Sequence, residues 1–307
     1  MRGHIVVVGS INMDLVVRAP RHPQPGETIL GTSFQTFPGG KGANQAVAAA
    51  RLGGEVYMIG RVGDDDFGKS MLATLHDASV DTRFVLVSEK SASGVALITV
   101  SDAGQNNIVV VPGANALLTQ ADVQAAESVF QGAAIVVCQL EIPLPAVREA
   151  ARLAHAYGAA FILNPAPAQL LDPPLLSQVD YLIPNEQELA LLTGMDNTSL
   201  AINAIRDLGM KHIIVTLGSE GALVMDQGEV YRLDAYPVAV IDTTAAGDAF
   251  VGAFAQALAE GKDGLAAAAW GNAAGALTVT RSGAQPSLPN RAALDEFFAL
   301  HPVQVQR

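Results

Sequence analysis

The second half of the chain repeats one pattern, a short apolar segment followed by a segment of helical length. The apolar segments fall at 135–140, 161–163, 181–183 and 213–217, and helical segments such as 145–157 and 186–192 separate them. Strands that are apolar on both faces belong in a sheet that helices cover on both sides, and a helix between two strands makes them parallel. The pattern predicts an α/β protein with a doubly wound, mostly parallel, Rossmann-like sheet.

The first half contains β-type segments that interrupt this alternation. They fall at 15–17, 28–30, 95–100 and 108–111. We therefore expect residues 14–36 and 94–111 to form a small sheet outside the main one, a lid on a single α/β domain that spans 1–307. The edges of such a sheet are free to pair with a second copy, which makes a homodimer through the lid the expected assembly.

Charge and cysteine content exclude several kinds of partner. The net charge is −12, and nucleic acids and anionic membrane surfaces both need clustered Lys and Arg. An anionic ligand must then be held locally, by backbone N–H groups, a few cations and a metal ion. Cys138 is the only cysteine and lies in an apolar segment, so the thiol is expected to be a core residue of a cytoplasmic protein.

The turn at 242–250 carries the strongest chemical signal. Small residues lead into an Ala-rich segment, 246–259, which is expected to be a helix together with 265–280. Small residues let the backbone approach a ligand, and a helix start offers unpaired N–H groups and the positive end of the dipole. Asp248, in the first turn, could accept a proton from an attacking hydroxyl during phosphoryl transfer. The alternative is that Asp248 only caps the helix.

Two further turns carry groups suited to a polyol. Residues 39–44 present Lys41 and Asn44 on a glycine turn that is not a P-loop, because Gln35 stands where that motif needs glycine. Asn12 and Asp14 are two residues apart on an extended segment, so their side chains point the same way. An amide beside a carboxylate can hold a vicinal diol, and Glu141 follows the 135–140 strand at the same rim. The alternative for residues 39–44 is a simple helix start, and the alternative for Glu141 is a solvated loop acid.

Other enzyme classes find no support. No Gly-x-Gly-x-x-Gly follows a strand, which argues against a dinucleotide oxidoreductase, and the six histidines lack metal-ligand spacing. Residues 216–221 do not form a nucleophile elbow. They read instead as a strand end and a glycine turn that could lie against a nucleotide.

Together these turns resemble the ribokinase (pfkB) family of carbohydrate kinases. Residues 39–63 match its N-terminal signature, with Asn44, Gly53 and Gly63 at the family spacing, and residues 242–254 match its C-terminal signature throughout. Two long patterns, far apart and in the expected order, are more specific than any short motif. The resemblance extends from residue 5 to about residue 298 and implies a ribokinase-like fold.

The resemblance implies a role for each matching residue. Asp248 would be the catalytic base, beside an anion hole formed by Ala245, Ala246 and Gly247. The residues implied to hold the sugar are Asn12, Asp14, Gly40, Lys41, Asn44, Glu141 and Asp248. Those implied to hold ATP and Mg²⁺ are Asn185, Glu188, Thr216, Gly218, Ser219, Gly221, Gly247 and Asn272. An activating monovalent cation, usually K⁺, would bind near Asp242, Thr244, Thr278, Arg281, Gly283 and Ser287.

The implied reaction is transfer of the γ-phosphoryl group of ATP to O5 of D-ribose, with Mg²⁺ and K⁺ as cofactors. Residues 39–46, 164–168 and 283–287 favour ribose over other acceptors, although the same sites would serve 2-deoxyribose. Asn272 departs from the pattern, because some members carry a histidine there beside the adenine. Fructose or a nucleoside is a further possible acceptor. A catalytically silent sugar- or nucleotide-binding protein is the rival of another class, and the intact Gly247-Asp248 pair argues against it.

Overall fold

The structure is a computed structural model that describes residues 3–302 and 305–306. A ten-stranded sheet forms the centre of the molecule. The strand order is β14-β13-β12-β11-β10-β9-β8-β1-β4-β5. The seven strands from β11 to β5 run parallel, and β12, β13 and β14 are added antiparallel at one edge. The strand bounds are β1 His4–Val8, β4 Val56–Gly63, β5 Val80–Ser88, β8 Ala133–Cys138, β9 Ala160–Leu163, β10 Tyr181–Leu182, β11 His212–Thr216, β12 Ala222–Asp226, β13 Glu229–Leu233 and β14 Val305–Gln306.

Helices cover both faces of this sheet, and each face has its own apolar core. In β1, Ile5 and Val7 belong to one core and Val6 and Val8 to the other, as the alternation of side chains along a strand requires. The first core contains α1 (Lys41–Arg51), α2 (Asp66–Asp77), α8 (Ala246–Ala259), α9 (Gly264–Thr278) and α10 (Arg291–Leu300). The second contains α3 (Gln120–Ala125), α4 (Leu144–Tyr157), α5 (Pro173–Leu176), α6 (Glu186–Thr193) and α7 (Thr198–Asp207).

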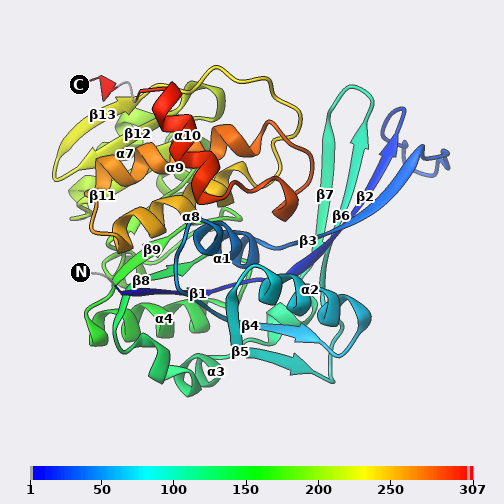
Figure 1. The fold of residues 1–307 in the computed structure, drawn as a ribbon, viewed down its shortest axis with the longest axis horizontal. Helices are drawn as coiled ribbons and strands as arrows, with labels where there is room; N and C mark the ends of the chain where they lie inside the picture. The colour runs from blue at the N-terminus through cyan, green and yellow to red at the C-terminus, as the bar shows by residue number, and fades with distance from the viewer. Residues whose placement is uncertain (1–2, 303–304, 307) are drawn as a thin grey trace.

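A second sheet of four strands projects from the body, at the right of Figure 1. It consists of β2 (Asn12–Ala19), β3 (Ser33–Gly39), β6 (Gly94–Ser101) and β7 (Asn106–Val111), in the order β3-β2-β6-β7. The β2–β6 pair is parallel and the other two pairs are antiparallel. We call this sheet the lid. Because β2 begins four residues after β1 ends, the chain passes directly from the carboxyl edge of the main sheet into the lid.

The expected elements are confirmed with two corrections. The expected strand at 28–30 is wrong: those residues lie in a loop, and the partner of β2 is β3 at Ser33–Gly39. The strand β5 was not predicted, because Asp81 and Arg83 interrupt its apolar pattern and the strand lies at the sheet edge with one side open to solvent. The helix predicted at 246–259 has the bounds of α8.

Close contact between α1 and α8 brings distant parts of the chain together. A Cβ placed on Gly252 of α8 would lie 2.6 Å from the carbonyl oxygen of Gln45 and 2.5 Å from Cβ of Ala48, both on α1. Only glycine allows the helices to approach this closely, since real Cβ atoms do not come within 3.0 Å of other heavy atoms. This approach sets the distance between the first turns of α1 and α8, where the site lies.

Candidate active site

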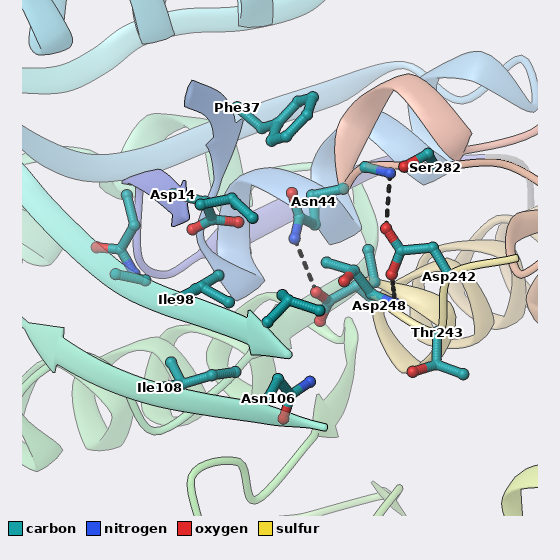
Figure 2. A pocket seen from close by; sticks show the side chains of 18 of the residues that line it. Asp14, Phe37, Asn44, Ile98, Asn106, Ile108, Asp242, Thr243, Asp248 and Ser282 are labelled. Carbon is teal, nitrogen blue, oxygen red and sulfur yellow. Dashed lines mark hydrogen bonds between the residues drawn. The ribbon is translucent and has the colours of Figure 1, made fainter. Parts of the chain in front are cut away.

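A cavity of about 510 Å³ lies between the lid and the carboxyl edge of the main sheet. Asp14 from β2, Asn44 from α1 and Asp248 from α8 all face it, opposite Ile98 and Ile108 from β6 and β7 (Figure 2). Ligands of open α/β sheets bind at this edge. The seven residues expected to hold the sugar all line the cavity: Asn12, Asp14, Gly40, Lys41, Asn44, Glu141 and Asp248.

Asp248 is held from two sides by the first turns of α1. Asn44 Nδ2 donates to Asp248 Oδ2 at 2.9 Å, and Gln45 Nε2 donates to Asp248 Oδ1 at 3.0 Å. Asp248 as a whole is 8% exposed and lines the cavity. Within the described residues no side chain caps the start of α8, so Asp248 does not act as the helix cap.

The start of α8 has the geometry of an anion site. Ala245, which lines the cavity, is in the left-handed region at φ 59°, a conformation that costs a non-glycine residue energy and that clusters at functional sites. A Cβ on Gly247 would have no described atom within 4 Å, so the backbone there is open to a ligand. Ala246 begins the helix, and its N–H is among the groups at the positive end of the dipole.

Glu141 ties three segments of the sugar side together. Its Oε2 accepts from Ser10 Oγ at 2.5 Å, from Asn12 Nδ2 at 3.3 Å and from the backbone N–H of Lys41 at 3.3 Å. Asn115 Nδ2 donates to Asn12 Oδ1 at 2.7 Å, which fixes the orientation of the Asn12 amide. The chain end of β8, the start of β2 and the start of α1 therefore meet at one carboxylate.

On the sugar side of the cavity wall, the carboxylates of Asp14, Glu141 and Asp248 lie with the ammonium group of Lys41. Burial raises the pKa of Asp14 to about 7, with Glu141 and Asp248 adding to the effect and Lys41 opposing it. Burial lowers the pKa of Lys41, but Asp248, Glu141, Glu188 and Asp14 more than compensate, so its pKa lies above the usual value. The wall thus offers both acceptors and a fixed cation to a polyhydroxylated ligand.

The residues expected at a monovalent cation lie beside the anion site. Asp242 Oδ1 accepts from the N–H of Thr244 and Asp242 Oδ2 from the N–H of Gly283, each at 2.9 Å. Burial raises the pKa of Asp242, but the hydrogen bonds from Gly283 and Thr244 lower it by more. The net pKa therefore lies below the usual value, which keeps the carboxylate ionised. The segment is tied to the end of α9, because the N–H groups of Ile241 and Asp242 donate to the Val279 carbonyl.

The other three cation residues are placed less directly. Thr278 and Ser287 are fully buried, and their hydroxyls donate to the carbonyls of Ala274 and Ala284. Arg281 is exposed. Burial lowers the pKa of Arg51, and the positive charge of Arg281 lowers it further. Carboxylate, hydroxyl and carbonyl oxygens are the donors that a hard cation prefers, so Asp242 and the two buried hydroxyls suit such an ion, whereas the Arg281 guanidinium does not.

The expected nucleotide residues lie along the next strands. Asn185 and Glu188 form a reciprocal capping box at the start of α6, and Asn185 forms a bridge with Thr216 at the end of β11. Burial raises the pKa of Glu188, with an opposing effect from Lys41, so this carboxylate is within electrostatic reach of the sugar side. Oxygen donors here suit Mg²⁺.

The remaining expected nucleotide residues are Gly218, Ser219 and Gly221 in the turn after β11, and Asn272 on α9. Gly218 and Ser219 begin a short 3₁₀ turn, Gly218–Glu220. Gly221 has φ 95° and its Cβ would lie 2.0 Å from the Leu233 carbonyl, so packing alone demands glycine there. Asn272 Nδ2 donates to the Asp234 carbonyl at 2.8 Å, which anchors α9 to the end of β13.

Several site residues received no role in the sequence. Asn115 orients Asn12, and Gln45, Asn164 and Gln139 form a chain of amides behind Asp248. Gln45 and Asn164 stand in the segments 39–46 and 164–168 that match the family, which was the available signal. The lid residue Phe37 and Thr243 and Ser282 beside Asp242 also line the cavity (Figure 2).

Comparison with known proteins identifies the family. The model of the pfkB family of carbohydrate kinases matches residues 2–291. The chain is 42% identical to a ribokinase of Bacillus subtilis, covering 96% of this chain and 99% of that one, and 37% identical to a deoxyribokinase of Salmonella typhimurium, covering 97% and 99%. The structure of Arabidopsis thaliana ribokinase complexed with ribose and ATP superposes with a TM-score of 0.88 at 36% identity, covering 97% and 99%. The chain belongs to the pfkB family of carbohydrate kinases.

Proposed function

We propose that this enzyme transfers the γ-phosphoryl group of ATP to O5 of D-ribose, with Asp248 as the base. The observation that carries the proposal is the position of Asp248, which faces the cavity from the first turn of α8 beside the open backbone of Gly247. A base must lie beside the hydroxyl while the anion site receives the developing charge. The similarity to the Arabidopsis enzyme, solved with ribose and ATP, supports both ligands.

The residues of the cavity divide the work. Asn12, Asp14 and Glu141 would hold sugar hydroxyls, and Asn44 and Lys41 would place the reacting hydroxyl against Asp248. The Ala246 and Gly247 N–H groups would meet the phosphoryl oxygens. The lid would exclude water, which competes as an acceptor.

Two ions would support this arrangement. Asn185 and Glu188 would hold Mg²⁺ with the phosphates of ATP, and the ion would neutralise phosphate charge. A K⁺ ion held by oxygens near Asp242 and Gly283 would order the turn that leads into α8. ATP as donor and the single buried thiol of Cys138 fit a cytoplasmic enzyme.

A panel of acceptors tests the proposal. Purified protein with MgATP is offered D-ribose, 2-deoxyribose, fructose and adenosine, each with and without K⁺, and ADP formation is measured. We expect ribose to give the highest kcat/KM and K⁺ to raise it. The resemblance to the Salmonella deoxyribokinase makes 2-deoxyribose the second candidate. A higher kcat/KM for another acceptor would contradict the ribose assignment, and an absence of K⁺ effect would contradict the cation site.

Asp14 links sugar binding to pH and to stability. Its folded pKa of about 7 lies above the ordinary value of 3.8, so between these pH values the unfolded chain binds fewer protons and stability falls as pH rises. Above pH 7 the Asp14 carboxylate is charged in the free enzyme, and its burial lowers the free energy of unfolding by the full amount. Asp14→Asn should therefore raise Tm at pH 8, with a smaller gain at pH 5, while raising the ribose KM at least about tenfold through loss of an acceptor.

Thermal melts at both pH values and ribose KM measurements check this. Asp102→Asn, at the exposed turn between β6 and β7, is the control and should change neither quantity. A lower Tm for Asp14→Asn at pH 8 would show that the carboxylate stabilises the free protein.

We propose that two copies associate through their lids. Leu97, Ile108, Val109 and Val110 are all more than 40% exposed, and β7 is an edge strand that is open on both faces. Apolar edge strands of this kind pair with a partner or are covered by one. Light scattering at micromolar concentration should give a dimer mass. Val109→Lys should shift it towards the monomer, whereas Leu208→Lys, at an exposed apolar position remote from the lid, should not. A monomeric wild type would contradict the proposal.

A further inference from the structure

A continuous chain of buried amides lies behind Asp248, on the side away from the cavity. Gln45 Nε2 donates both to Asp248 Oδ1, at 3.0 Å, and to Asn164 Oδ1, at 3.1 Å. Gln139 Nε2 donates to Gln45 Oε1 at 2.7 Å. The three amides follow β8 and β9 or lie on α1, so three elements converge on one carboxylate from behind.

The outer members of this chain fix the orientation of the inner one. An amide side chain can turn over and present its oxygen in place of its nitrogen. Gln139 donates to the oxygen of Gln45, and Asn164 presents its own oxygen because its Nδ2 is engaged by the Ile183 carbonyl at 2.8 Å. Both contacts favour the orientation in which Gln45 turns its NH₂ group towards Asp248.

Gln45 cannot reach a ligand. Its side chain is 1% exposed, and Gln45 is not among the described residues that line the cavity, whereas the neighbouring Asn44 is. Asn44 can therefore contact both Asp248 and the sugar, but Gln45 can act only through Asp248 and the core. The two bonds also occupy different carboxylate oxygens, so together they fix the plane of the group.

We infer that Gln45 is a positioning residue for phosphoryl transfer, which fixes the plane of the Asp248 carboxylate and aims it at the acceptor hydroxyl. This inference rests on the proposed function. Misplacement of a base by a fraction of an ångström costs rate while it leaves substrate contacts in place. The effect of losing Gln45 should therefore fall on kcat, not on the KM for ribose.

The first test replaces Gln45 with leucine, which keeps the size and removes the donor. We expect kcat with ribose to fall roughly 10- to 100-fold, within the range that a positioned base supplies, while the ribose KM changes less than about threefold. A core residue without a positioning role would lower Tm and leave kcat of the folded enzyme unchanged.

Gln256→Leu is the matched control. Gln256 is also a buried glutamine, it lies on α8 with Asp248, and its amide donates to Glu260 at 3.0 Å. Its replacement should lower Tm at most and leave kcat and KM unchanged.

A double variant separates positioning from general damage. In an Asp248→Asn background, Gln45→Leu should reduce kcat less than about threefold further, because a residue that acts through the base has nothing left to position. Fold-changes that multiply would overturn the inference. If Gln45→Leu does not fold, Gln45→Glu is made instead; it keeps the shape, replaces the donor with a like charge beside Asp248, and should lower kcat with little change in the ribose KM. A wild-type kcat in a folded Gln45→Glu enzyme would also overturn the inference.

Wild-type turnover distinguishes the two failures. A wild-type protein that forms no ADP with any sugar overturns the proposed function and this inference together. An active wild type with an unaltered Gln45→Leu enzyme overturns the inference alone.

Discussion

Asp248→Asn should lower kcat for the sugar acceptor by roughly 10²–10⁴, the usual contribution of a positioned general base. An asparagine keeps the size of the side chain and can still accept one of the two bonds from Asn44 and Gln45, so the fold and the cavity are retained. It cannot take the proton of the attacking hydroxyl. The ribose KM should therefore change much less than kcat.

Steady-state kinetics and a thermal melt of the same preparation check this expectation. Asp66→Asn is the matched control, because Asp66 also lies in the first turn of a helix, α2, but is exposed and outside the cavity. That variant should lose at most a few tenths of a kcal/mol of stability through the helix dipole. Turnover of Asp248→Asn within threefold of wild type would remove the carboxylate from the mechanism.

Gly252→Val should lower both stability and activity. The new Cβ would meet the Gln45 carbonyl oxygen at 2.6 Å and Ala48 Cβ at 2.5 Å, and backbone atoms of α1 cannot move without the helix. Overpacking of this kind costs roughly 1–3 kcal/mol, and the added γ-methyl groups make the crowding worse. Because α1 carries Asn44 and Gln45, a shift of the helix also lengthens their bonds to Asp248, so kcat falls with Tm.

Melting curves and kcat of the folded fraction measure the two effects. Gly264→Ala is the control: it lies at the start of α9, and its Cβ would meet Tyr181 at an ordinary 3.5 Å. That substitution should leave both quantities near wild type. Normal kcat in a destabilised Gly252→Val enzyme would show that the helix contact supports the fold without setting the geometry of the base.

The sequence predicted elements wherever local pattern and tertiary environment agree. The buried parallel strands and α8 have uniform apolar or small-residue character, so their positions were confirmed within one or two residues. β3 and β5 are edge strands, and their residues alternate with polar or charged side chains. Such strands depend on the partner strand more than on their own composition.

The site divides in the same way. Asp248 and Asn44 could be predicted because each stands in a turn of small residues, and Asp14 because it lies two residues from Asn12 on an extended segment. Gln45 contacts Asp248 and Asn115 contacts Ile11, and in each pair the two residues are more than a hundred positions apart. The sequence around Gln45 or Asn115 does not reveal the distant partner. Side chains that orient other side chains become visible only when the fold brings the partners together.

The pairing of α1 with α8 has a consequence for the synthesis of the protein. The residues proposed to hold the sugar come from the first fifth of the chain and Glu141, whereas the proposed base and anion turn come from α8, near the C-terminal end. Until the ribosome has added α8, the growing chain contains the residues proposed to bind the sugar but lacks Asp248, the proposed base for the sugar hydroxyl. A chain truncated before α8 would lack Asp248, so under the proposed function it should not transfer phosphate to the sugar.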